Sequence, residues 1–168
     1  MREVEDGVDI TIRVAFALVA MLLAVLLLTG VWLTFNYRPG VSEPLRTAHR
    51  LAAFAVVPVG LLVPAAVVVR KRGVGIVVAV AFFAGLVAAS FTGYLLPWDQ
   101  LGLWAVTVGR PMAGVLHPFD ETVRFVIIGG AEISTALYCM WVIVHLALLP
   151  LVLLATGGFL VQRFLLRP

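Results

Sequence analysis

The chain has 168 residues, of which 62% are hydrophobic and only 12% are charged. This composition is too apolar for a soluble domain of that size. Four apolar runs are long enough to cross a bilayer, because a spanning helix needs about 20 mostly apolar residues. The net charge of +3 is modest, so we expect no nucleic-acid partner. The composition predicts an all-α membrane protein, with residues 1–168 forming a single bundle of four transmembrane helices.

The first half of the chain holds two of the four apolar runs. We predict helices over 10–36 and 44–69, joined by a short loop, with a polar surface tail over 1–9. The first run lacks a small-residue cleavage site, which favours a retained helix over a signal peptide. Pro58 and Pro64 interrupt the second helix, as membrane helices tolerate when neighbours satisfy the freed carbonyl groups.

The second half holds the other two runs. We predict helices over 74–96 and 132–160, joined by a long connection over 98–131. A connection of this length is usually functional, and its segments 101–108 and 119–128 suit short interfacial helices. The lone cysteine in the fourth span cannot form an internal disulfide bond.

Orientation follows from the positive residues near the ends of the spans. With the N-terminus in the cytoplasm, seven Lys and Arg residues lie inside and five outside, which is a weak bias. We expect a multi-pass protein of the inner (cell) membrane with both termini cytoplasmic and the loops 37–43 and 98–131 outside.

Two histidines lie within the predicted spans, His49 in the second and His145 in the fourth, whereas His117 lies in the long connection. An ionisable residue inside a membrane is costly and is a functional candidate by default. Neutral imidazole is a good axial ligand for haem iron, and facing helices of a bundle can build such a site. From the residues alone, a pair of hydrogen-bonding histidines at helix interfaces is an equally good interpretation.

The sequence at the end of the third span has a distinctive pattern. Residues 93–106 read GYLLPWDQLGLWAV, with a proline that stops the helix and tryptophans suited to the lipid–water interface. This segment resembles helix C and its exit in the cytochrome b/b6 family, the haem subunits of quinol-oxidising bc-type complexes. The b6-type members are the most similar.

Further motifs extend the resemblance over about residues 26–160. The segment LTGVWL at 28–33, followed by Tyr37, is similar to the end of the family's helix A. The interval from Gly93 to His145 is 52 residues, and a proline follows His145 by five residues, as in b6-type members.

The resemblance implies a haem held between the second and fourth helices, with His49 and His145 as axial ligands. Arg46, three residues before His49, occupies the place of an arginine that pairs with a haem propionate. Gly30 and Gly93 lie where the family has glycines, which let a flat ring approach the backbone closely. The candidate cofactor-binding residues are His49, His145, Arg46, Arg50, Gly30 and Gly93.

The sequence departs from the family at the places that serve a second haem. Family members carry a second histidine nearly four helical turns after the first on each ligand helix, with one residue more on the b6-type helix D. They also carry a second glycine nearly four turns before each of the two glycines. Those positions here are Val63, Phe159 or Leu160, Phe16 and Ala79. Because all of these side chains are apolar, we predict one haem b per chain.

The resemblance implies an electron-transfer subunit of an oxidoreductase complex, and not an enzyme alone. Two histidine ligands leave no open iron position for a substrate. The expected partners are membrane lipid, quinone or quinol, and other redox subunits or a second copy of the chain. Three alternatives stay open: a haem-containing anchor of a dehydrogenase or hydrogenase complex, a haem-free structural membrane subunit, and a small channel or transporter. The spans hold few polar residues for a channel.

Overall fold

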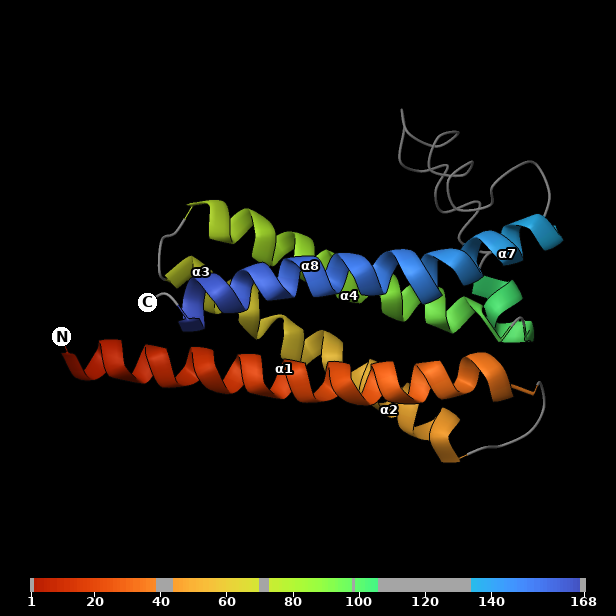
Figure 1. Cartoon of the computed structure of the whole chain (residues 1–168), viewed down its shortest axis with the longest axis horizontal. Coiled ribbons are helices and arrows are strands. Elements are labelled where there is room, and N and C mark those ends of the chain that lie inside the picture. Colours follow the sequence, from red (N-terminus) through yellow and green to blue (C-terminus); the bar gives the residue numbers. More distant parts are fainter. Residues whose placement is uncertain (1, 39–43, 70–72, 98, 106–133, 167–168) are drawn as a thin grey trace. The chain divides into compact units, whose positions relative to one another are not determined.

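The computed structural model describes residues 2–38, 44–69, 73–97, 99–105 and 134–166 (Figure 1). Within these ranges the regular structure is entirely helical, as the composition predicts. Four helical stretches are long and apolar enough to cross a membrane. They are Ile10–Asn36, Pro44–Val69, Gly73–Leu95 and Thr135–Leu166.

The first span belongs to a longer helix, and the second is broken in two. Helix α1 covers Arg2–Asn36, so the segment expected to be a surface tail continues the helix. Helix α2 covers Pro44–Gly60 and α3 covers Leu62–Val69. The break falls at Leu61, because Pro64 has no N–H to donate to the carbonyl of Gly60. Pro58 is accommodated inside α2.

Helix α4 covers Gly73–Leu95 and ends two residues before Pro97. A short helix over 100–105 follows. Asp99 caps it, because the Asp99 carboxylate accepts a hydrogen bond from the Gly102 N–H at 2.9 Å. The rest of the connection, including His117 and the predicted segment 119–128, lies outside the described residues.

The fourth span changes helix type along its length. Ser134 caps helix α7, Thr135–Ile143, by accepting a hydrogen bond from the Leu137 N–H. A π-helical turn η1, Val144–Leu148, leads into α8, Leu149–Val161, and a second π-helical turn η2, Gln162–Leu166, ends the described part. The helix thus runs on beyond the predicted end at residue 160. Single π turns inside α-helices occur frequently at functional sites.

The chain forms two compact units, each with its own packing. The first unit comprises residues 1–90 and 151–168 and has a large cluster of buried apolar side chains. The second unit comprises residues 91–150 and has a small core of Leu95, Leu137 and Trp141. Many large apolar side chains on the spans are exposed, as expected for surfaces that meet lipid rather than water.

Candidate functional site

In the first unit, His49 is held against α1 by its neighbours Thr29 and Gly30. The hydroxyl oxygen of Thr29 lies 2.8 Å from Nδ1 of His49. A Cβ atom built on Gly30 would lie 3.3 Å from Cε1 of the same imidazole. The flat ring that approaches the backbone at Gly30 is therefore the imidazole of His49, which α2 carries beside α1.

The hydrogen bonds of Thr29 favour a proton on Nδ1 of His49. The Thr29 hydroxyl donates its only hydrogen to the carbonyl of Val25 at 2.6 Å. The hydroxyl oxygen can then accept a hydrogen bond from an Nδ1–H of His49. In neutral imidazole this leaves Nε2 without a proton, and the Nε2 lone pair is the one that can bind a metal.

In the second unit, His145 repeats this arrangement on α4. The hydroxyl oxygen of Thr92 lies 2.9 Å from Nδ1 of His145. A Cβ atom on Gly93 would lie 2.8 Å from Cε1 of the imidazole, closer than real contacts allow. His145 itself lies in the π-helical turn η1. Each unit therefore presents one imidazole that a threonine holds through Nδ1 and a glycine admits to the helix surface.

The two threonines are site residues that sequence reasoning missed. Within the described part of the chain, Thr29 and Thr92 are the polar residues that are buried, at 8% and 2% exposure. The signal in the sequence is a Thr-Gly pair that occurs in both the first and the third span. The pair alone is not sufficient, because Thr156-Gly157 repeats it and Gly157 faces Phe82 instead of a histidine.

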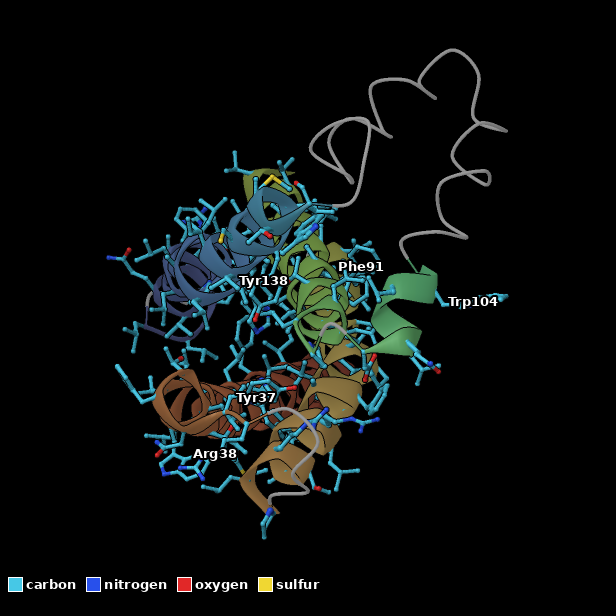
Figure 2. The ribbon with its side chains drawn as sticks, turned by 90° about the vertical axis from the view of Figure 1, so that its right-hand side faces the viewer. Tyr37, Arg38, Phe91, Trp104 and Tyr138 are labelled. Carbon is cyan, nitrogen blue, oxygen red and sulfur yellow. The ribbon has the colours of Figure 1, made fainter. Side chains whose placement is uncertain are left out.

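The two arginines near His49 lie at the start of α2. The guanidinium of Arg46 stacks over the ring of Tyr37, 5.3 Å from its centroid, and Arg50 is exposed. Figure 2 shows Tyr37 and Arg38 together at the end of α1. Arg46 thus lies one turn before His49, with its charge held at the end of the span.

The positions that the family resemblance assigns to a second haem lie in the core of the first unit. Val63, Ala79 and Leu160 are completely buried, and Phe16 is nearly so. All four belong to one apolar core cluster. Phe159 is 40% exposed, so Leu160 is the residue of the fourth span that packs into this core.

Comparison with known proteins identifies the family of the chain. The family model for the cytochrome b N-terminal/b6/petB domain matches residues 65–166, which is more than half of the chain. The chain belongs to this family. With its four apolar spans it is a multi-pass membrane protein, as predicted from the sequence.

Individual relatives differ in how much of the chain they match. Cytochrome b6 of Heliobacterium mobile is 38% identical over 77 residues, which are 46% of this chain and 35% of that protein. Cytochrome b6 of Porphyra purpurea is 27% identical over 159 residues, covering 82% of this chain and 73% of that protein. The match to the heliobacterial protein spans about a third of its length, whereas the algal alignment covers most of both chains.

The glycine contacts predict a graded series of stabilities. Gly93→Ala places a methyl group against the imidazole of His145 and should destabilise the protein by about 1–3 kcal/mol. Gly30→Ala places its methyl group 3.3 Å from the imidazole of His49, which is a looser contact, and should reduce the stability by less. Gly158→Ala is the matched control, since nothing lies within 4 Å of its Cβ position, and should be neutral or slightly stabilising. Thermal unfolding in detergent measures the series, and equal stability of the Gly93 and Gly158 variants would contradict the described contact.

Proposed function

We propose that this chain is a membrane cytochrome b that transfers electrons through one haem b with His49 and His145 as its axial ligands. Under this proposal each unit contributes one ligand. The observation that carries the proposal is the repeated Thr-Gly-His arrangement within the spans. A haem would supply the one-electron redox change of its iron.

The residues present fit the requirements of this cofactor. An axial ligand needs a neutral imidazole whose metal-binding nitrogen carries no proton, and the contact with Thr29 favours that tautomer in His49. Thr92 offers the same contact to His145. The glycines keep both imidazoles close to rigid helices, and rigid elements hold a site more accurately than loops.

The packing of the first unit supports a single haem. Two imidazoles at Val63 and Leu160 would have to replace completely buried side chains. The flat porphyrin would also need the space that Phe16 and Ala79 fill in the same core. Overpacking of this kind costs about 1–3 kcal/mol for each clash.

The position of His49 supports a haem toward the outer face. His49 lies five residues after the first residue of α2, or about 8 Å along the helix. With both termini cytoplasmic in the inner membrane, α2 begins on the outer side.

We propose that electrons pass at this outer face between quinone or quinol and a partner redox subunit, with the segment 98–131 as docking surface. One haem near one face cannot carry electrons across the bilayer, so a partner or a second copy must supply the rest.

Replacing the ligands tests the proposal directly. His49→Ala and His145→Ala should each abolish the low-spin b-type spectrum of the purified protein, because iron loses an axial ligand. His117→Ala is the matched control and should keep the spectrum. A protein that is colourless before any substitution would favour a haem-free structural subunit instead. Loss of the haem in the His117 variant, with retention in the His145 variant, would show the ligand assignment to be wrong.

The threonine contacts predict a shift of the haem midpoint potential. Donation by Nδ1–H makes the imidazole a more basic ligand, which favours ferric iron. Thr29→Val and Thr92→Val should therefore each raise the midpoint potential and weaken haem retention by about tenfold or more. Thr156→Val is the control, because the Thr156 hydroxyl donates to the Val152 carbonyl on its own helix. Redox titration of the visible spectrum gives the result, and a fall in potential would contradict the assigned donor.

Haem stoichiometry tests the single site. The unmodified protein should hold one haem b per chain, measured as pyridine haemochrome against amino-acid analysis. The double substitution Val63→His with Leu160→His should not raise the ratio, because Phe16 and Ala79 still fill the porphyrin space. A ratio near two in the unmodified protein would overturn the single-haem proposal.

A further inference from the structure

In the first unit, the exposed face of α2 carries a cation among apolar side chains. Arg50, Leu51 and Phe54 lie on this face, at the spacing that places residues on one side of a helix. Leu51 is 64% exposed and Phe54 is 67% exposed. His49 instead lies against α1, where Thr29 and Gly30 contact its ring. Arg50 therefore belongs to the side of α2 that is turned away from the histidine site.

The spans provide no negative charge for Arg50. None of the four spans contains an aspartate or a glutamate, so no helix that packs beside α2 within the bilayer can offer a carboxylate. The first turn of α2 also has no acidic residue. A charged side chain in a membrane segment is costly unless it has a partner or reaches the interface. An anion for Arg50 has to come from outside the spans.

The position of Arg50 along α2 adds to the positive charge. It lies six residues after Pro44, the first residue of the helix, or about 9 Å along the axis. The unpaired N–H groups at the N-terminal end of a helix carry a partial positive charge. Arg46 lies one turn before Arg50, and like charges at this spacing repel one another. This end of α2 therefore favours the binding of an anion.

Two other exposed arginines of the spans differ from Arg50 in this respect. Arg13 follows an acidic stretch over residues 3–9 of the same helix. Arg163 lies in the π-helical turn η2 at the C-terminal end of its span, where helix carbonyl groups favour a cation. Arg50 has neither compensation, so its charge indicates a ligand that the first unit does not itself supply.

We propose that Arg50 binds the phosphate of an anionic phospholipid whose acyl chains lie along Leu51 and Phe54. The planar guanidinium matches two phosphate oxygens at once. Lipid phosphates lie in the headgroup regions that flank the hydrocarbon core, and arginines near the ends of spans extend toward these regions. The inference does not depend on a haem. It assigns Arg50, which the family resemblance made a cofactor candidate, to lipid.

The surroundings favour an anionic lipid over other sources of phosphate. Arg46 is stacked over Tyr37 at the end of α1, and Arg38 follows Tyr37 (Figure 2). A zwitterionic headgroup would bring its own cation to this end of the two helices, which already carries three arginines. Free phosphate would gain nothing from the exposed Leu51 and Phe54. An anionic phospholipid uses both the charge and the apolar face.

The test measures lipid binding by the purified full chain in detergent. Native mass spectrometry follows titrations with dioleoylphosphatidylglycerol and, separately, with dioleoylphosphatidylcholine. The variants are Arg50→Gln, Arg50→Lys and Phe54→Ala. Arg163→Gln is the matched control, because it removes one exposed arginine from the opposite kind of helix end. Thermal unfolding in detergent checks that each variant is folded.

Arg50→Gln should weaken the binding of phosphatidylglycerol by about tenfold, as expected for the loss of hydrogen bonds to a charged group. Arg50→Lys should restore part of the affinity, because lysine keeps the charge but not the two parallel hydrogen bonds. Phe54→Ala should also weaken binding, and excess inorganic phosphate should not displace the lipid. The affinity for phosphatidylcholine should be lower throughout and insensitive to Arg50→Gln. Arg163→Gln should match the unmodified protein.

Several results would overturn the inference. One is equal affinity for phosphatidylglycerol in the unmodified protein and Arg50→Gln, or, if that variant does not fold, in Arg50→Lys. Another is equal weakening by Arg163→Gln, because any exposed charge would then serve. Displacement of the lipid by inorganic phosphate would assign Arg50 to a free anion. Unchanged lipid binding with a shifted haem midpoint potential in Arg50→Gln would return Arg50 to the cofactor.

The inference and the proposed function can fail separately. A protein that binds no haem but prefers phosphatidylglycerol through Arg50 would overturn the proposed function and leave the lipid site standing. A protein with a low-spin haem whose lipid binding ignores Arg50 would do the reverse.

Discussion

The hydrogen bond between an imidazole Nδ1 and a threonine hydroxyl is the interaction on which the described sites depend. Inside a bilayer no water satisfies a polar side chain, so its partner must come from the protein. A threonine hydroxyl can do this only if its helix lies in contact with that of the histidine. Glycine beside the threonine makes the contact possible, since a Cβ atom on Gly93 would come within 2.8 Å of the His145 ring. One pair of neighbouring residues, a threonine and a glycine, thus both brings the helices into contact and holds the imidazole.

The need for a protein partner also explains why the two histidine sites contain buried polar side chains whereas the core cluster of the first unit does not. The core residues Val63, Ala79 and Leu160 are completely buried and carry no polar atom in their side chains. They require no partner and can pack closely against one another. Polar residues are buried in the described part of the chain at the two threonines, and each contacts a histidine. The distribution of polar groups therefore separates the regions that can hold a ligand from those that only pack.

The sequence predicted the four spans well, because apolar runs of spanning length have few other interpretations. It did not predict that α1 begins at Arg2, since the acidic start has no apolar pattern to identify a helix.

The sequence analysis also did not identify Thr29 and Thr92 as candidate site residues. Threonine is common in membrane helices, and the partner of a hydroxyl lies on another helix that one sequence does not reveal. His49 and His145 were predicted as site residues because a histidine in a span is rare and costly, together with the resemblance to the cytochrome b/b6 family. The two histidines also differ in their support from comparison, because the family model matches residues 65–166, which contain His145 but not His49. The structure nevertheless gives His49 the same threonine and glycine contacts.

The π-helical turn at His145 accounts for the spacing that the sequence left open. A π turn closes its hydrogen bonds over five residues instead of four and holds about one residue more than an α turn. An interval that crosses such a turn is therefore one residue longer than the corresponding interval in a regular α-helix. The interval from His145 to Leu160 crosses η1 and is one residue longer than the interval from His49 to Val63. This is why Leu160 is buried while Phe159 is exposed. The extra residue in η1 thus accounts for the one-residue difference between the two intervals in this chain.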